Sequence, residues 1–398
     1  MLAAVPFGGT WRECELDADE WVLLGATARQ HRLEPLLHGL LPGMQDSRSV
    51  PASHRAAWQE AHRRSAMAAL AAKAALIRVG RILDTAGIAY AALKGGWLAW
   101  HAYPNPALRP MRDLDILVSP SRLEAAYRAL VARGFEELSG EAFSAATLAM
   151  GQKHLPALRD QATGIFVEVH SRLFEHIEPA QADARLARSD DLLAARLWQP
   201  LGPVQIAYLP PCETLLHVLV HSAYEHRFDN GPQVLHDVSA LLAREAVDWE
   251  RFWTMADEGG WTRGCQLVLR LTECMLGPQA TGWGPEGAPT LPDGILDQAA
   301  LMLLQDPDLR QDLDVQLQLG DVSAGGWVRL QRLAARMLPA RRVVAAQAGV
   351  SPDRRSAWLH YPGWLVSRFA RTARGALDGR QRSEVVRANA IETWLAGR

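Results

Sequence analysis

The sequence predicts an α+β protein in which a small mixed sheet, with helices on one face, lies between helical regions. Three observations predict this class. The apolar spacing changes from helix-like to strand-like after Gly87, residues 88–170 mix short strand-like and helix-like segments, and the chain after Arg172 is almost entirely helical in pattern. These changes divide the chain into four regions. They are a helical N-terminal region at 1–85, the sheet-containing core at 86–175, a helical region at 176–276 and a basic helical region at 295–398.

The composition is ordinary for a soluble globular protein. Of the 398 residues, 48% are hydrophobic and 22% are charged, which excludes disordered and collagen-like chains. The four cysteines show no CxxC spacing, which argues against a zinc ribbon or a disulfide framework. The first residues do not form a signal-peptide pattern, and apolar residues nowhere run long enough for a membrane span. We therefore expect a cytoplasmic protein.

Helix-like spacing dominates the N-terminal region. Residues 17–38 contain helical patches, and residues 52–86, rich in Ala, Leu and Arg, form one longer helical pattern. Gly87 is well placed to end this longer helix. The face that we expect to be buried carries Met67, Leu70, Ala74, Ile77 and Ile82.

The core alternates short strands and helices. Strand-like segments are rich in aliphatic residues, and the helix at 120–133 has a suitable N-cap in Ser119 and ends at Gly134. Residues 160–164 have the composition of a hairpin loop. The predicted strands are 88–93, 114–118, 135–138, 154–159 and 165–170, and the predicted helices are 96–103 and 120–133.

The region after the core is predicted to be helical. Two antiparallel helices are expected at 211–226 and 234–245, joined by a turn at 228–232. The Gly- and Pro-rich residues 277–294 interrupt the helical pattern, so we expect a loop or a domain boundary there.

Two acidic residues stand out in the core. Asp113 and Asp115 lie two apart at the start of a predicted strand, so their carboxylates project from one face. Such a pair shares a proton, faces water or is held together by a cation, and a divalent metal is the usual reason for both to stay ionised. Upstream, Gly95 and Gly96 follow a strand and open a helix, where backbone N–H groups can meet an anion. The pattern predicts a site for a metal and a triphosphate, although a solvent-facing strand end and a plain tight turn are the simpler alternatives.

These motifs resemble those of the uncharacterised bacterial nucleotidyltransferases of the polymerase-β-like superfamily. The resemblance covers roughly residues 60–245 and includes a glycine pair at a helix start, an Asp-x-Asp strand and a third carboxylate on a later strand. The residues that carry it are Leu93-Lys94-Gly95-Gly96, Tyr103-Pro104, Arg109-Pro110, Asp113-Leu114-Asp115 and Glu168.

The resemblance implies a fold and a set of roles. It implies a polymerase-β-like nucleotidyltransferase core in which Asp113, Asp115 and Glu168 are catalytic and bind Mg²⁺. It also implies that the triphosphate of an NTP, with ATP expected, lies against the glycine pair. Lys94 or Arg109 would pair with the phosphate charge, although an ion pair with the carboxylates is as good an expectation for Arg109.

Three further residues are candidates for the acceptor side. His170 shares a strand face with Glu168 and would steady that carboxylate or the acceptor, or serve a structural role. The resemblance implies that His221 and Asp237 line the acceptor pocket, whereas a satisfied polar core is the simpler alternative. His217 and His221 lie four apart, but this spacing without the Glu of HExxH is a weak zinc signal.

The C-terminal part of the chain is strongly basic. Residues 327–398 contain 14 arginines and four acids, a net charge of about +10, whereas the whole chain carries −2. Residues 364–377 combine arginines with apolar residues in a helical pattern. This pattern fits contact with phosphate, an anionic membrane surface, RNA or the acidic remainder of the chain, or simply a solvated surface helix.

The sequence thus predicts a Mg²⁺-dependent transfer of an NMP group from an NTP to an unidentified hydroxyl or phosphate acceptor, with release of pyrophosphate. Two alternatives stay open. One is a non-catalytic partner-binding or regulatory module that kept the fold. The other is an enzyme that nucleotidylates a protein or peptide rather than a small molecule.

Overall fold

A computed structural model describes residues 16–43, 49–137, 154–174, 189–228, 230–283, 291–305, 361–362 and 389–397. The chain divides into two compact units, Met1–Leu296 and Asp297–Arg398. The predicted basic helix at 364–377 and most of the C-terminal region lie outside the described residues. All of the elements that form the site belong to the first unit.

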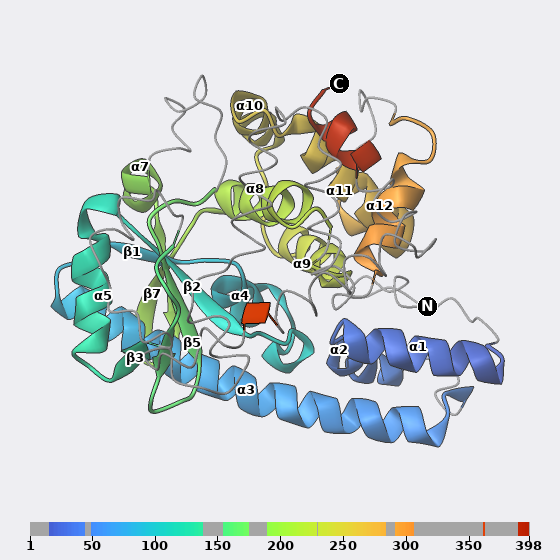
Figure 1. Ribbon diagram of the computed structural model, residues 1–398, viewed down its shortest axis with the longest axis horizontal. Coiled ribbons are helices and arrows are strands. Elements are labelled where there is room, and N and C mark those ends of the chain that lie inside the picture. The colour runs from blue at the N-terminus through green and yellow to red at the C-terminus, as the bar shows by residue number, and fades with distance from the viewer. Residues whose placement is uncertain are drawn as a thin grey trace. The chain divides into compact units, whose positions relative to one another are not determined.

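Three helices form the N-terminal region (Figure 1). They are α1 (Ala18–Gln30), α2 (Glu34–Leu40) and α3 (Ala52–Thr85). Asp17 caps α1 in a reciprocal capping box with Glu20. The helical patches predicted within 17–38 form two helices, α1 and α2, which are separated at Arg32, whose φ is +56°. The 34 residues of α3 extend over about 51 Å at 1.5 Å per residue, so this helix reaches from α2 to the sheet.

The predicted buried face of α3 is wrong, although the helix itself is present. Met67 and Leu70 are 67% and 63% exposed, Ala74 is exposed, and Ile77 and Ile82 are only half-buried. The buried side of α3 instead carries mostly small and aliphatic residues. They are Trp58, Ala61, Ser65, Ala69, Ala72, Ala75, Leu76, Val79, Gly80 and Leu83. Small side chains allow the helix to pack closely against its neighbours. The side of α3 that carries the larger residues Met67 and Leu70 therefore faces solvent.

The core is a seven-stranded mixed sheet, which confirms the predicted α+β class. The strand order is β3-β4-β5-β2-β1-β7-β6, with β2 parallel to β5, β1 parallel to β7 and the other pairs antiparallel. The strands are β1 (Tyr90–Ala92), β2 (Asp113–Val118), β3 (Phe135–Glu137), β4 (Leu158–Asp160), β5 (Phe166–His170), β6 (Leu197–Leu201) and β7 (Val204–Tyr208).

The hairpin of β6 and β7 corrects the prediction that the chain after Arg172 is almost entirely helical. The alternation from Val204 to Tyr208 suits a strand, and Gly202, with φ +67°, forms the turn between the two strands. Trp97 donates a hydrogen bond from Nε1 to Oε1 of Gln199 at 2.9 Å, which ties the hairpin to the segment after β1.

Helices α3 and α5 (Leu123–Val131) pack against one face of the sheet and against each other (Figure 1). The 3₁₀ turn η5 (Pro120–Arg122) precedes α5, and Ser119 bonds the Ser121 hydroxyl rather than capping a backbone N–H group. After β1 the chain forms α4 (Gly95–Trp97), the π-helix η3 (Leu98–Ala102) and the 3₁₀ turn η4 (Pro106–Leu108). The predicted helix at 96–103 is therefore present in a wider, π-type form.

The described part of the region after the core contains the expected antiparallel pair. The helix predicted at 211–226 is α8 (Pro211–Val220) followed by the π-helix η8 (His221–Glu225), and its partner is α9 (Gln233–Leu242). Further helices among the described residues are α7 (Ser189–Ala194), α10 (Trp249–Glu258), α11 (Thr262–Leu276) and α12 (Ile295–Leu303). Gly277, with φ +101°, ends α11, where the sequence predicts a break.

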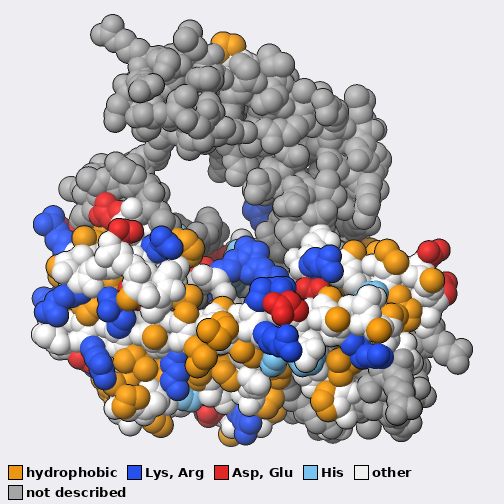
Figure 2. All heavy atoms as spheres, turned by 90° about the horizontal axis from the view of Figure 1, so that it is seen from below, with side chains coloured by type: hydrophobic (Ala, Val, Ile, Leu, Met, Phe, Trp, Pro, Cys, Tyr) orange, Lys and Arg blue, Asp and Glu red, His pale blue; other side chains and the backbone are white. Residues whose placement is uncertain are grey.

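Figure 2 shows one face of the molecule, on which Lys and Arg side chains are spread among hydrophobic and neutral ones. At its centre several basic side chains lie beside acidic ones.

Among the described residues, none of the helices combines the length and the apolar character that a membrane crossing needs.

Candidate functional site

Two carboxylates lie side by side on neighbouring strands of the sheet. In the parallel pairing of β2 and β5, Asp115 stands directly opposite Glu168 and Asp113 opposite Phe166. Residues opposite each other in register point to the same face, as do residues two apart on one strand. The three predicted acidic residues therefore share one face of the sheet.

Asp115 is the buried centre of this group. Burial alone would raise its pKa, but the ammonium of Lys94 and the imidazole of His170 hold the pKa of Asp115 well below its usual value. Asp113 lies at the exposed start of β2. Partial burial of its carboxyl group, together with the charges of Asp115 and Glu168, raises the pKa of Asp113 to about 6. Asp115 is thus kept ionised, whereas Asp113 takes up a proton more readily.

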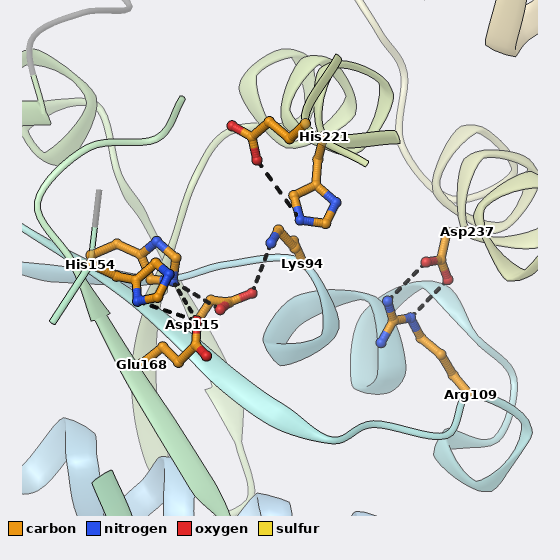
Figure 3. A network of polar contacts seen from close by, with 9 residues as sticks. Lys94, Arg109, Asp115, His154, Glu168, His221 and Asp237 are labelled. Carbon is orange, nitrogen blue, oxygen red and sulfur yellow. Dashed lines mark hydrogen bonds and ion pairs between the residues drawn. The ribbon is translucent and has the colours of Figure 1, made fainter. Parts of the chain in front are cut away.

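Histidine side chains surround the two carboxylates (Figure 3). His170 Nε2 lies 2.9 Å from Asp115 Oδ1 and 3.5 Å from Glu168 Oε2. His154 Nδ1 lies 3.8 Å from the same Glu168 oxygen. The hydrogen bond with His170 lowers the pKa of Glu168, and Asp115 raises the pKa of His170 against the opposing effect of burial.

The turn after β1 brings a lysine to the carboxylates. Lys94 Nζ lies 3.1 Å from Asp115 Oδ2, with side-chain exposures of 17% and 9%. The backbone of Lys94 has φ +39° and ψ −113°, a region that residues with a side chain rarely adopt. Gly95 and Gly96 follow, both buried. The predicted phosphate-binding turn is therefore adjacent to the predicted metal ligands.

Arg109 and Asp237 form a separate buried pair. Arg109 Nε and Nη2 donate to the two carboxylate oxygens of Asp237 at 2.7 and 2.8 Å, and the Tyr103 hydroxyl donates to Asp237 Oδ1 at 2.7 Å. Burial lowers the pKa of Arg109, but the charge and hydrogen bonds of Asp237, together with Tyr103 and Asp113, raise the pKa overall. A Cβ atom on Gly95 would lie 2.5 Å from Arg109 Nη1, so the guanidinium lies against the turn. Arg109 is therefore close to the site, although two of its nitrogens are held by Asp237.

His221 approaches the carboxylates from η8, and its ring points toward Lys94 (Figure 3). It is one of the groups that lower the pKa of Asp115, and its Nε2 lies 3.9 Å from Glu225 Oε2. The rings of His217 and His226 lie beside it, at centroid distances of 5.9 and 4.2 Å. Of the acceptor-side candidates, His170 thus belongs to the carboxylate cluster, His221 faces it, and Asp237 is engaged by Arg109.

One group among the described residues has the geometry to hold a metal ion. Ligand atoms of Asp115, Glu168 and His170 all lie within 4.8 Å of one another. The carboxylates suit a hard divalent cation, and the imidazole adds a nitrogen donor that Mn²⁺ accepts more readily than Mg²⁺ does. The sequence predicted Asp113 in this ligand set and placed His170 on the acceptor side. His170 and Glu168 lie two apart on one strand, and this spacing is the sequence signal that His170 belongs with the candidate metal ligands.

Tyr103 and His154 also contact site residues, although no sequence motif predicts a functional role for either side chain. Tyr103 contributes only its hydroxyl group to Asp237. His154 comes from a segment that pairs with the end of β5 through an isolated bridge to His170. Neither contact has a local sequence signal, because each depends on how distant segments pair.

The mixed sheet, with its acidic group on neighbouring strands after a glycine turn, is consistent with a nucleotidyltransferase fold. Residues 17–277 match the model of a protein family described as uncharacterised nucleotidyltransferase. The chain belongs to this family, which confirms the resemblance drawn from its motifs. No curated protein matches the chain.

Proposed function

We propose that the protein is a Mg²⁺-dependent nucleotidyltransferase that moves an NMP group from an NTP, with ATP the expected donor, to a hydroxyl or phosphate acceptor. The observation that carries this proposal is the register of β2 and β5, which sets Asp115 opposite Glu168 with His170 between them. Asp113 is proposed as a further ligand because it shares the strand face. Bound Mg²⁺ would neutralise phosphate charge and lower the pKa of the attacking hydroxyl.

In the proposed reaction, an acceptor oxygen, which in a hydroxyl group gives up its proton to solvent, forms a bond to the α-phosphorus of the NTP. The bond from that phosphorus to the bridging oxygen breaks, and pyrophosphate leaves with the electron pair. Lys94 and the Gly95-Gly96 turn would hold the triphosphate, and Arg109 would add positive charge from its side of the turn. His221 faces the carboxylates and is the proposed group that contacts the acceptor.

Calorimetric titration with each of the four NTPs, with and without Mg²⁺, tests this proposal. We expect Mg²⁺-dependent binding of at least one NTP by the wild-type protein. Asp115→Asn removes one charge from the metal ligands and should weaken that binding at least about tenfold. Glu124→Gln, in an exposed ion pair of α5, is the matched control and should bind as the wild type does.

Transfer itself is tested by incubating labelled NTPs with cell extract and measuring label incorporation and pyrophosphate. We expect the wild type to raise both above the level of extract alone and Asp115→Asn to raise neither. Label on a protein band would identify a protein or peptide acceptor, and label on small molecules would identify the other class. Equal transfer by wild type and Asp115→Asn would contradict the proposed metal site. No Mg²⁺-dependent nucleotide binding at all would contradict the proposed function and favour a partner-binding module.

A further inference from the structure

Lys94 occupies the place where a cation would be expected. Its Nζ atom lies 3.1 Å from Asp115 Oδ2, and His170 Nε2 lies 2.9 Å from Asp115 Oδ1. Both oxygens of this nearly buried carboxylate are therefore engaged within the chain itself. A divalent ion bound to Asp115 would lie beside the Lys94 ammonium, so two positive charges would compete for the same carboxylate.

The backbone holds the Lys94 side chain in this place at a cost. A residue other than glycine is strained at φ +39° and ψ −113°. Glycine would relieve the strain, and the next two residues are glycines. A lysine at this strained position indicates a role for its ammonium group, which contacts Asp115.

The backbone on either side of Lys94 is fixed by hydrogen bonds. The N–H group of Leu93 donates to the Asp115 carbonyl oxygen at 2.9 Å, and the Lys94 carbonyl accepts from Trp97 and Leu98 at 3.0 and 2.9 Å. The backbone therefore stays in place when the ammonium group moves. A displaced ammonium would remain beside Gly95, where the proposed function places the triphosphate.

We propose that Lys94 is a resident counter-ion of Asp115 that competes with a divalent cation for this carboxylate, so that Lys94 couples metal loading to NTP binding. This inference rests on the proposed function. Without NTP, the ammonium competes with the metal for the carboxylate. With NTP bound, the phosphates offer the ammonium another partner, and the metal binds Asp115 without this competition.

Electron paramagnetic resonance of free Mn²⁺ measures the competition without any turnover. We expect the wild-type protein to bind Mn²⁺ weakly alone and more tightly with α,β-methylene ATP, which cannot be cleaved at the α–β bridge. Lys94→Met should raise the Mn²⁺ affinity of the nucleotide-free protein roughly tenfold, the order set by one charge-assisted hydrogen bond. The gain in affinity from the nucleotide should shrink accordingly.

Three further variants make the test specific. Lys94→Gly removes the ammonium and relieves the backbone strain, so it should fold and should also bind Mn²⁺ more tightly. Lys94→Arg keeps the positive charge and should stay near wild type. Lys73→Met makes the same substitution at another described lysine, on α3, and should leave Mn²⁺ binding unchanged.

Two outcomes separate this inference from the proposed function. If wild-type protein binds no Mn²⁺ with or without nucleotide, the proposed metal site itself is wrong. If wild type binds Mn²⁺ and both Lys94→Met and Lys94→Gly bind it equally or more weakly, the metal site stands and the counter-ion role is refuted.

Discussion

Replacing Asp237 by Asn tests the buried pair that joins α9 to the segment before β2. Asp237 and Arg109 are 6% and 9% exposed, and the aspartate accepts two hydrogen bonds from the guanidinium and one from Tyr103. The Asn side chain would keep one oxygen that accepts hydrogen bonds, but its NH₂ group would face a donor N–H of Arg109. The buried charge of Arg109 would then lack a compensating negative charge. Breaking such a pair costs about 3–5 kcal/mol, which lowers the unfolding temperature of the unit Met1–Leu296 by about 5–8 °C.

Thermal unfolding followed by tryptophan fluorescence measures this change. Glu124→Gln breaks an exposed ion pair instead and should shift the transition by little, because such pairs contribute about 0–1 kcal/mol. Removing the whole polar group, with Arg109→Met, Asp237→Leu and Tyr103→Phe together, should recover much of the loss. Unfolding of Asp237→Asn at the same temperature as Glu124→Gln would show that the buried pair does not stabilise the fold.

Two further predictions concern packing. Gly95→Ala places a Cβ atom 2.5 Å from Arg109 Nη1, so denaturant unfolding should show a loss of about 1–3 kcal/mol, and an unchanged midpoint would mean that the guanidinium does not lie against the turn. On α3, Leu76→Ala should lower the free energy of unfolding by about 2–5 kcal/mol, because Leu76 is fully buried, whereas the exposed Met67→Lys should change it by about 0.5 kcal/mol or less. Similar losses from both α3 substitutions would contradict the buried face described above.

The position of the acidic group could be predicted because its signals are local. Asp113 and Asp115 precede a short apolar run, and Glu168 lies in a second one. Each run forms a strand with period-two alternation, so a face could be assigned to each carboxylate. The parallel pairing of the two strands then sets Asp115 opposite Glu168.

The features that were missed depend on contacts between distant segments. Arg109 and Asp237 are 128 positions apart, and no local pattern indicates their pairing. In α3, apolar residues occur on every side, so the spacing alone could not show which side packs against the sheet. The β6 and β7 hairpin is short, so its strand pattern is weak. It joins the main sheet through the pairing of Tyr208 with Ala92, which lies far away in the sequence.

The pairing of β2 with β5 also predicts where this chain tolerates changes in length. Deleting one residue within the first half of β5 would turn Glu168 to the opposite side of the sheet and place a valine across from Asp115. The turn at residues 161–164 lies before β5, so an insertion there would not change the register between β2 and β5. We therefore expect related chains to vary in the length of that turn and to keep the spacing within the two strands constant.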